Sequence, residues 1–310
     1  MNNIIKVLLT GGTGMVGRNI ISARKDKKLL LLAPARLEMD LASRDSVLQY
    51  LNKHKPDVII HAAGFVGGIQ ANITEPVNFL VNNIVIGQNI LLCARELGIK
   101  RLINLSSSCV YPKDAESPLH EDLILNGRLE PTNEGYALAK IATSKLCEYI
   151  NREDRSFQYK TIIPCNLYGP YDDFDLGRSH LLPSIIVKIH NAMLLGLDSV
   201  EIWGDGLARR EFMYVADAAD LILKSIDNFD DLPDVMNCGL GFDYSVNDYY
   251  KSVSSVLGWG GKFTHDLAKP VGMKRKMVDT SRQQSFGWKP KIKLEDGIKE
   301  TYKFYLKTIR

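Results

Sequence analysis

Tyr136 and Lys140 are one helical turn apart and have the side chains needed to transfer a proton to a carbonyl oxygen. A ketone that accepts a hydride develops negative charge on its oxygen and needs a proton there. A phenol has a pKa of about 10, which a nearby ammonium group can lower. Residues i and i+4 lie on the same face of a helix. The pair therefore predicts a hydride-transfer enzyme in which Tyr136 is the acid and Lys140 lowers the pKa of its phenol.

A serine run upstream of this pair supplies a hydroxyl for the carbonyl oxygen. The run Ser106-Ser107-Ser108-Cys109 follows a strand-like segment, and Ser107 is the residue we expect to hold the oxygen. Tyr-x-x-x-Lys alone is a weak signal, because an ordinary amphipathic helix can carry both residues on its surface. The serine run and the glycine loop near the N-terminus favour the catalytic interpretation.

The glycine loop is a variant of the dinucleotide fingerprint. Gly11, Gly14 and Gly17 stand between a predicted strand, 4–10, and a predicted helix. Glycines in this pattern allow a tight turn, close approach of the backbone to a pyrophosphate, and packing of the helix against the strand. The pyrophosphate then lies at the positive end of the helix. We expect Thr13 and Met15, inside the loop, to contact the cofactor as well.

The end of the second strand indicates which cofactor binds. An NAD site usually has an acid there for the ribose diol. This strand ends Ala33-Pro34-Ala35-Arg36, and Arg36 can form a forked contact with a 2′-phosphate, which favours NADPH. In the alternative, Arg36 is solvated and Glu38 turns to the ribose. Asp40 and Leu41 are expected against the adenine, although Asp40 could equally be a surface acid.

Apolar runs and helical patterns alternate along the first half of the chain. Strands are predicted at 4–10, 29–32, 57–61, 101–105 and 159–163, and helices at 43–53 (with Ser43 as N-cap), 76–97 and 137–153. This order predicts an α/β fold with a Rossmann-type, doubly wound parallel sheet. Such sheets bind ligands at the carboxyl ends of their strands. The glycine loop, Ala62-Ala63-Gly64, the serine run and 166–170 should therefore share one rim.

The alternation weakens after residue 168. We predict an NADP-binding domain from residues 1–168 with a return segment at about 210–240. A smaller α/β substrate-binding domain is expected mainly from residues 169–310. Within this domain a turn is predicted from Trp203 to Gly206.

Composition excludes several other classes of protein. The chain of 310 residues has a net charge of +3 with interspersed charges, which argues against nucleic acid as a partner. No apolar run was expected to reach the roughly 18 residues of a membrane span. The five cysteines are scattered without a Cys-x-x-Cys pair, which predicts no structural metal and a reducing compartment. With no signal-peptide pattern at the N-terminus, a cytoplasmic location is expected.

The motifs together resemble a known family. The glycine loop, the serine run and Tyr136-x-x-x-Lys140 resemble the extended short-chain dehydrogenases/reductases. Six further segments narrow the resemblance to the GDP-L-fucose synthases: Gly67–Asn72, Ser107–Pro112, Leu129–Glu134, Asn166–Pro170, Ser179-His180 and Arg210–Phe212. The similarity extends from the first strand almost to the last residue. It implies NADPH as cofactor and a GDP-4-keto-6-deoxy sugar as substrate, which is inverted at C3 and C5 and then reduced at C4.

The resemblance also implies roles for individual residues. Ser107, Tyr136 and Lys140 correspond to the reductive set, and Cys109 and His180 to the base and acid of epimerisation. Other matching positions are implied in cofactor binding (Ala62, Ala63, Asn166, His180) and in nucleotide-sugar binding (Lys188, Trp203, Arg210, Lys276). The resemblance further implies a homodimer, which the helices 76–97 and 137–153 could form by pairing with their copies.

Several departures from the family pattern leave the substrate open. Thr13 and Lys188 stand where basic and arginine side chains are expected, and Gly135 and residues 175–178 also differ. The changes near the sugar could admit another 4-keto sugar, such as a heptose. Cys109 could instead only pack under the substrate, and His180 only bind a hydroxyl. The remaining alternatives are a C4-reductase without epimerisation, a non-catalytic NADP-binding scaffold, and an NAD-dependent epimerase or dehydratase.

Overall fold

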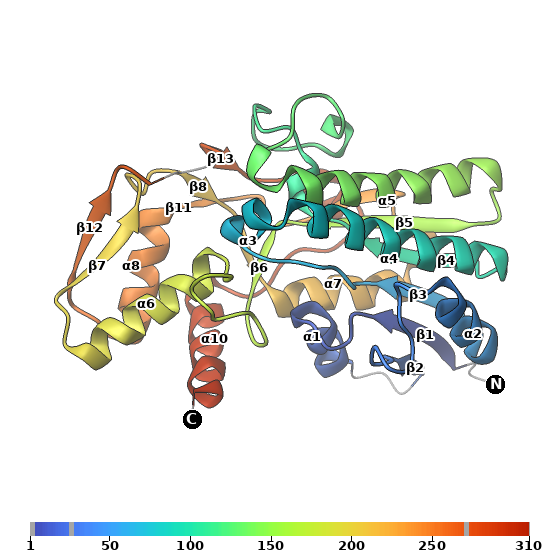
Figure 1. Ribbon diagram of the computed structural model, residues 1–310, viewed down its shortest axis with the longest axis horizontal. Helices are drawn as coiled ribbons and strands as arrows, with labels where there is room; N and C mark the ends of the chain where they lie inside the picture. Colours follow the sequence, from blue (N-terminus) through green and yellow to red (C-terminus); the bar gives the residue numbers. More distant parts are fainter. Residues whose placement is uncertain (1–3, 25–27, 270–272, 310) are drawn as a thin grey trace.

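Six parallel strands form the main sheet of the protein, in the order β10-β5-β4-β3-β1-β2 (Figure 1). The computed structural model describes residues 4–24, 28–269 and 273–309. The strands are β1 (Ile5–Thr10), β2 (Leu29–Leu32), β3 (Val58–His61), β4 (Arg101–Leu105), β5 (Gln158–Pro164) and β10 (Val235–Cys238). The predicted doubly wound α/β sheet is confirmed. The strand order reverses between β1 and β3, the point at which such sheets bind ligands.

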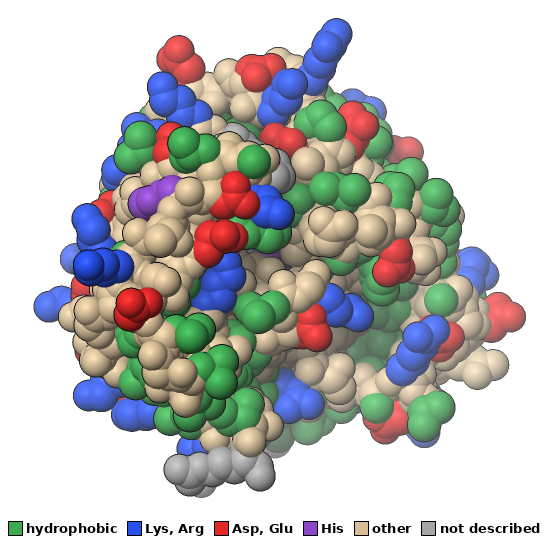
Figure 2. Space-filling view, turned by 60° about the vertical axis from the view of Figure 1, so that its left-hand side comes forward, with side chains coloured by type: hydrophobic (Ala, Val, Ile, Leu, Met, Phe, Trp, Pro, Cys, Tyr) green, Lys and Arg blue, Asp and Glu red, His purple; other side chains and the backbone are tan. Residues whose placement is uncertain are grey.

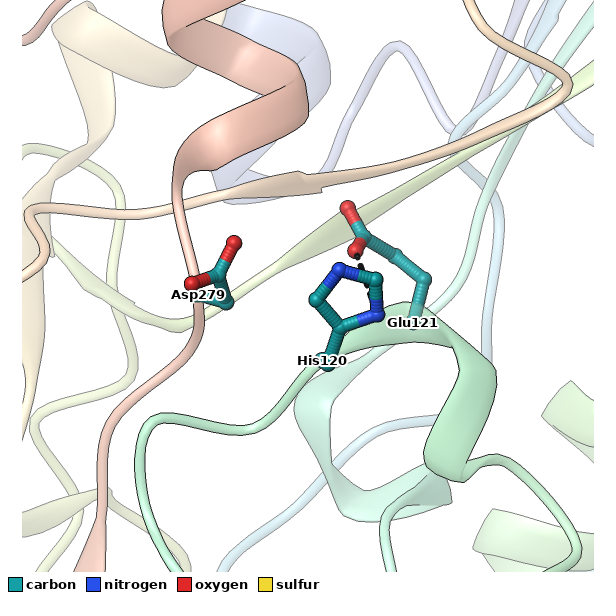
Figure 3. Close-up of side chains that lie close together, drawn as sticks. All are labelled: His120, Glu121 and Asp279. Carbon is teal, nitrogen blue, oxygen red and sulfur yellow. Dashed lines mark ion pairs between the residues drawn. The ribbon is translucent and has the colours of Figure 1, made fainter.

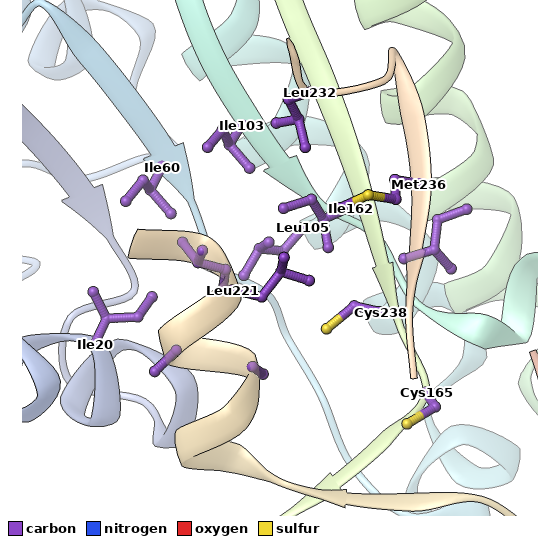
Figure 4. Close-up of a cluster of buried hydrophobic side chains, with 14 of the residues drawn as sticks. Ile20, Ile60, Ile103, Leu105, Ile162, Cys165, Leu221, Leu232, Met236 and Cys238 are labelled. Carbon is purple, nitrogen blue, oxygen red and sulfur yellow. The ribbon is translucent and has the colours of Figure 1, made fainter. Parts of the chain in front are cut away.

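Helices cover both faces of this sheet. One face packs against α2 (Arg44–His54), α4 (Pro76–Glu96) and α5 (Glu134–Glu153), and the other against α1 (Met15–Ala23) and α7 (Val215–Asp227). Successive strand residues serve alternate faces, so Leu8 lies in the first core and Leu9 in the second. Figure 4 shows the second core, where Leu221 on α7 lies beside Leu105 of the sheet and Ile20 on α1 lies nearer to Ile60. Both faces are buried, which explains the continuous apolar runs of these strands.

Local signals placed most of these elements correctly. Ser43 caps α2 as expected, accepting a hydrogen bond from the Ser46 amide at 3.3 Å. The helix predicted from residue 137 begins at Glu134, because a 3₁₀ turn at Pro131–Asn133 leads directly into it. The short helix α3 (Ile69–Thr74) and the sixth strand β10 were not predicted. Both are too short for a periodic pattern of apolar residues to distinguish them from a loop.

Smaller sheets and a third core occupy the other end of the molecule. The core packs around α6 (Leu181–Leu195), α8 (Val246–Leu257) and α10 (Leu294–Thr308). The remaining elements are β6 (Asn166–Tyr168), β7 (Ser199–Trp203), β8 (Arg209–Arg210), β9 (Phe212–Tyr214), β11 (Tyr244–Ser245), β12 (Lys262–Asp266), β13 (Arg275–Lys276) and α9 (Ser281–Ser285). These strands form the sheets β11-β8-β13, β12-β7 and β6-β9. Figure 2 shows acidic, basic and apolar side chains mixed over this end of the molecule, without a patch of one sign.

Helix α4 requires a correction to the sequence analysis. Its 21 residues are long and apolar enough to cross a membrane by length and composition, although no such segment was expected. Phe79, Ile90 and Leu91 on this helix are buried. Asn83, also buried, donates to the Phe65 and Phe79 carbonyls at 3.0 and 2.7 Å. Packing against the sheet accounts for the apolar composition of α4. The cellular location stays a prediction.

Ion pairs join the segment between β4 and α5 to the C-terminal part of the chain. His120, Glu121 and Asp279 present ligand-type atoms within 4.8 Å of one another, as Figure 3 shows. Arg282 is the counter-ion of this group, 3.6 Å from Glu121 Oε2 and 2.8 Å from Asp122 Oδ1. A built-in guanidinium makes the cluster an ion-pair network, so it gives no support for a metal site.

Candidate active site

The glycine loop at the end of β1 has the geometry of a dinucleotide site. Gly11 has φ +73°, and a Cβ there would lie 2.7 Å from the Ala63 amide nitrogen. A Cβ on Gly17 would lie 2.2 Å from the Gly11 carbonyl oxygen, so α1 can approach β1 only with glycine there. Gly14 precedes α1 and no side chain caps the helix. The free amides of α1 are thus available to a pyrophosphate, and the loop fits the predicted cofactor.

The residues expected at the adenosine end lie on an exposed turn. The Arg36 side chain is 82% exposed, and its Nε lies 3.6 Å from Asp40 Oδ1. Glu38 accepts a hydrogen bond from the Ala35 amide at 2.8 Å, which ties its carboxylate to the turn itself. Leu41 packs against the core under α2. The contact of Glu38 with its own turn favours Arg36, rather than Glu38, as the residue presented to a cofactor.

Ser107, Tyr136 and Lys140 come together at the carboxyl edge of the sheet. Ser107 follows β4 and starts the 3₁₀ turn η1 (Ser108–Val110), while Tyr136 and Lys140 lie in the first turns of α5. The Ser107 hydroxyl is close enough to the Tyr136 phenol to lower its pKa. Lys140 Nζ donates to the Leu105 carbonyl at 2.9 Å and lies 5.8 Å from the Tyr136 ring centroid. The three side chains predicted to carry out reduction therefore share one site.

The expected effect of Lys140 on Tyr136 is not seen in this state. Burial is the main influence on the Tyr136 phenol and raises its pKa, while the hydrogen bond from Ser107 opposes the rise. Lys140 is not among the groups that lower it, and its ammonium points to the Leu105 carbonyl instead. Burial lowers the pKa of Lys140 itself to about 8. The sequence analysis considered charge and neglected burial, which dominates at this site.

Cys109 and His180 come from different parts of the chain, and both are influenced by the charge of Lys276. Cys109 is 5% exposed, and burial raises the pKa of its thiol although Lys276 and Ser107 oppose this. His180 is the N-cap residue of α6. Burial, and then the charge of Lys276, lowers the pKa of its imidazole. In this state the thiol is protonated and the imidazole neutral at pH 7.

Lys276 is the side chain that connects these groups. It lies on β13 in register with Arg210 on β8, so the two cations are neighbours across the sheet. Burial is the main cause of the lowered pKa of Lys276, and Cys109, Arg210 and Glu130 also act on it. Glu130, for which no role was predicted, also raises the pKa of Arg210 against the lowering effect of burial. Two cations beside one carboxylate retain net positive charge, which suits a phosphate.

Lys188 and Trp203 form a second group at the β7 edge. The Trp203 side chain is 51% exposed, and Lys188 Nζ lies 5.7 Å from its ring centroid. Lys269 Nζ lies 5.4 Å from the same ring. Lys188 Nζ also donates to the Glu201 carbonyl at 3.2 Å. An exposed indole flanked by cations can stack on a planar base.

The remaining residues predicted to bind the cofactor lie in the loops that follow the strands. Ala62 and Ala63 follow β3 and lie against Gly11, with the Ala63 amide donating to Thr10 Oγ1 at 3.3 Å. Asn166 opens β6 and donates to the Glu211 carbonyl at 3.1 Å. Thr13 donates no hydrogen bond within the described ranges, and its carbonyl accepts one from Arg18 Nε at 2.9 Å. These residues therefore follow the carboxyl ends of β1, β3 and β5.

Two acids, one buried and one half-buried, had no predicted role. Glu211, which is 1% exposed, accepts hydrogen bonds from the backbone amides of residues 240, 241 and 278. It thereby joins β13, which carries Lys276, to the end of β10. Asp172 follows the predicted 166–170 segment, and burial raises its pKa to about 7. A burial pattern can be inferred from sequence for apolar residues, but the sequence gives no comparable signal for isolated acids.

Comparisons with known proteins agree with this geometry. Residues 7–239 match the model of the NAD dependent epimerase/dehydratase family. The chain is 54% identical to GDP-L-colitose synthase from Yersinia pseudotuberculosis, over 97% of this chain and 98% of that protein. It is 49% identical to GDP-L-fucose synthase from Azorhizobium caulinodans, over 97% and 96%.

A solved structure extends the comparison to the fold. MlghC, a GDP-mannoheptose C4 reductase from Campylobacter jejuni with NADP bound, is 29% identical, with a TM-score of 0.89 and 99% of each chain covered. The match spans both the large sheet and the C-terminal elements. The prediction of a nicotinamide-dependent enzyme is confirmed by the family match. The chain belongs to the NAD-dependent epimerase/dehydratase family of extended short-chain dehydrogenases/reductases.

Proposed function

We propose that the protein reduces the C4 ketone of a GDP-4-keto-deoxy sugar with NADPH, after inverting the configuration next to the ketone. The observation that carries the proposal is that Ser107, Tyr136 and Lys140 lie together with Cys109, and that the charge of Lys276 acts on both Cys109 and His180. The similarity to GDP-L-colitose synthase and GDP-L-fucose synthase supports a GDP-sugar as substrate. Lys276, Arg210 and the indole of Trp203 are the groups suited to its pyrophosphate and base.

The chain's own residues account for both steps. A 4-keto group acidifies the protons on C3 and C5, and their removal leaves an enolate with charge on O4. Ser107 and Tyr136 donate hydrogen bonds to that oxygen, so one pair of donors serves inversion and reduction. Bound NADPH supplies the hydride for C4, and Tyr136 gives its proton to O4. Lys140 is positioned to hold the cofactor ribose.

The sugar is the part of this proposal that most needs an experiment. Fucose carries a hydroxyl at C3, whereas colitose is a 3,6-dideoxy sugar, so only C5 is inverted in making it. The relative with 54% identity favours the 3-deoxy substrate. We expect turnover when the protein is incubated with NADPH and GDP-4-keto-3,6-dideoxymannose, with a product inverted at C5. A clear preference for GDP-4-keto-6-deoxymannose or for a 4-keto heptose in the same assay would reject the colitose assignment.

Arg36 is expected to set the preference for NADPH. A guanidinium contact with a 2′-phosphate is worth about 1.5–3 kcal/mol, or roughly ten- to a hundredfold in affinity. Arg36→Ala should weaken NADPH binding by about this factor and leave NADH binding nearly unchanged. Fluorescence titration with both cofactors measures this. Glu38→Gln is the matched control, because an inward-turned Glu38 would instead raise NADPH affinity when neutralised.

The rate of reduction is expected to fall as the pH rises through about 8. Burial lowers the pKa of Lys140 to about 8, so its ammonium is charged below that pH and neutral above it. If cationic Lys140 holds the cofactor and supports Tyr136, kcat/KM has its alkaline limb there. Lys140→Arg keeps the charge at every pH and should move the limb upward while lowering the rate. If kcat/KM of this variant still falls near pH 8, the titration of Lys140 does not cause the fall.

One other function is separated from this one by isotope exchange. A C4-reductase that acts after a separate epimerase would give no solvent deuterium at C3 or C5. The other alternative, a non-catalytic NADP-binding scaffold, disagrees with the family match. The clustering of Ser107, Tyr136 and Lys140 argues against the scaffold, because a protein that only binds cofactor needs no buried acid beside the ketone site.

We also propose a homodimer in which α4 and α5 pair with their copies. The two helices together expose Val77 (69%), Val81 (48%), Leu138 (43%) and Tyr149 (46%). Exposed apolar residues on adjacent helices suit a four-helix interface. Val81→Glu should shift the protein toward monomer in sedimentation velocity. Leu194→Glu, at a 71% exposed position on α6, should not. A monomeric wild type would refute the dimer.

The division of the chain into two units is likewise a proposal. Residues 1–168 with about 210–240 would form the NADP-binding unit, and most of 169–310 the substrate-binding unit. It is supported by the position of α7 and β10 on the large sheet, although both follow residue 168 in sequence.

A further inference from the structure

Four polar side chains form a row across the centre of the main sheet, close to Lys140. They occupy matching register positions on β1, β3, β4 and β5, with exposed fractions of 0–2%: Thr10, His61, Asn104 and Thr161. The residues two positions earlier on these strands are also paired with one another. They are apolar and belong to the core under α2, α4 and α5: Leu8, Ile59, Leu102 and Tyr159. Because side chains alternate between faces, the polar row faces α4 and α5.

The first half of the row is connected by hydrogen bonds. The Ala63 amide donates to Thr10 Oγ1 at 3.3 Å, and the same oxygen lies 2.9 Å from His61 Nδ1. Burial, with a contribution from the charge of Lys140, lowers the pKa of His61 to about 3, so its ring is neutral. Thr10 accepts from Ala63 and can donate its own proton to Nδ1. That arrangement leaves the ring proton of His61 on Nε2, the nitrogen remote from Thr10.

The second half of the row contains a gap. Asn104 Nδ2 donates to Thr161 Oγ1 at 3.5 Å, but Asn104 Oδ1 is buried without a hydrogen-bond partner among the described residues. Exchanging the two ends of the amide would only leave the nitrogen orphaned instead. Asn104 is the register neighbour of His61, which has a proton on the side away from Thr10. The only hydrogen bond of the His61 ring among the described residues is the one to Thr10. A buried acceptor without a partner in such a polar layer is the usual setting of an internal water.

We propose that an ordered water bridges His61 Nε2 and Asn104 Oδ1, and that the completed row positions and solvates the ammonium of Lys140. Lys140 is 6% exposed, and its Nζ donates to the carbonyl of Leu105, the residue that follows Asn104. The other end of the row holds the Ala63 amide, against which Gly11 of the nucleotide loop packs. One polar layer thus supports both the lysine and the loop. Thr10, His61 and Asn104 are positioning residues.

The proposal rests on the part of the proposed function in which Lys140 holds the cofactor. Its consequence follows from desolvation, which disfavours a charged lysine. Without the polar layer the pKa of Lys140 falls further, so the ammonium is lost at a lower pH. Cofactor binding should then weaken most at alkaline pH and least at acidic pH. A substitution that merely loosened the fold would weaken binding at every pH.

The first test is a high-resolution crystal structure of the wild-type protein with NADPH. We expect a water within hydrogen-bonding distance of both His61 Nε2 and Asn104 Oδ1. A direct contact between the two side chains, or no density between them, would overturn the proposal. This observation requires no sugar substrate.

The second test measures NADPH affinity from pH 6 to pH 9 by fluorescence. Asn104→Leu should bind NADPH about three- to tenfold more weakly than wild type at pH 8 and nearly equally at pH 6, which corresponds to a shift of up to one pKa unit. Thr301→Val is the control, because it removes another buried hydroxyl, bonded to the Gly297 carbonyl at 2.7 Å on α10. If Asn104→Leu does not fold, Thr10→Val takes its place.

The outcomes separate this inference from the proposed function. An equal loss of affinity at every pH, or none at all, rejects the positioning role even if the water is present. Normal pH-dependent NADPH binding without reduction of any GDP-4-keto sugar rejects the proposed substrate and leaves the polar layer supported. If the wild type binds no NADPH, the role of Lys140 and this inference fall together.

Discussion

Tyr136→Phe is expected to lower kcat for reduction of the 4-keto sugar by about 10²–10⁴-fold, the usual contribution of a general acid. Phenylalanine keeps the ring, which packs edge-on against Phe79 at 6.3 Å between centroids, and removes only the proton donor. Affinity for NADPH and GDP should therefore stay within about threefold of wild type, since no bulk is lost. Stopped-flow absorbance at 340 nm and equilibrium titration measure the two quantities.

Controls make this result specific to the phenol proton. Tyr302→Phe removes a hydroxyl that lies 3.0 Å from His190 Nδ1, where Tyr302 packs against the third core, and should leave kcat unchanged. Ser107→Ala should weaken both inversion and reduction, because Ser107 is the second hydrogen-bond donor proposed for O4. Activity of Tyr136→Phe within tenfold of wild type would show that another group protonates O4.

The pKa shift of Tyr136 differs in direction from the one that the sequence suggested. In the sequence analysis Lys140 activated Tyr136, but burial raises the pKa of the phenol in this state and the ammonium faces Leu105. A protonated phenol is the form needed to give a proton to O4. The raised pKa is thus compatible with reduction and unfavourable for the reverse oxidation, in which the phenolate would have to accept a proton.

Much of the fold could be predicted because its signals are local. Ile5–Thr10 and Leu29–Leu32 are apolar runs bounded by turns, and Gly11 and Gly17 occupy positions where a Cβ would collide with the backbone. Such signals need no knowledge of distant residues. Strand β10 was missed for the opposite reason. Its four residues pair with β5 from more than sixty residues away, and only the finished sheet selects them.

The site was predictable in type but not in arrangement. Residue type and spacing were enough to predict Tyr136, Lys140 and Ser107. Lys276 was assigned to the nucleotide-sugar by resemblance, whereas the structure places it among Cys109, His180 and Arg210 through the pairing of β13 with β8. That pairing joins two-residue strands without periodicity. Glu130 had no pattern of its own, and its relevance comes entirely from the two cations beside it.

Cys109→Ala and His180→Asn are expected to abolish solvent exchange at C5 while sparing the reduction of a substrate that is already inverted. In D₂O the wild type should place deuterium at C5, and each variant should lower its incorporation by about 10²-fold or more, as loss of an acid–base group does. Cys93→Ala removes a buried thiol from α4, away from the cleft, and is the control. Deuterium can be located in the product by NMR.

The pH dependence of this exchange identifies the base. Burial raises the pKa of the Cys109 thiol above its ordinary 9.0, so thiolate increases with pH through the neutral range. The pKa of His180 is lowered below 6.5, mainly by burial, so its neutral form predominates at pH 7. An exchange rate that rises with pH up to the limit set by Lys140 assigns the base to Cys109. A rate that is level between pH 7 and 8 assigns it to His180, with the Cys109 thiol as the acid on the opposite face.

The same experiment decides between the bifunctional enzyme and the reductase alone. If the wild type reduces its substrate without deuterium at C3 or C5, Cys109 and His180 bind the sugar and do not epimerise it. Their variants would then raise KM and leave kcat nearly unchanged, the signature of uniform binding. If exchange occurs and both variants lose it, the oxyanion donors Ser107 and Tyr136 serve two successive reactions, and the protonation states of one thiol and one imidazole determine the order in which the protons move.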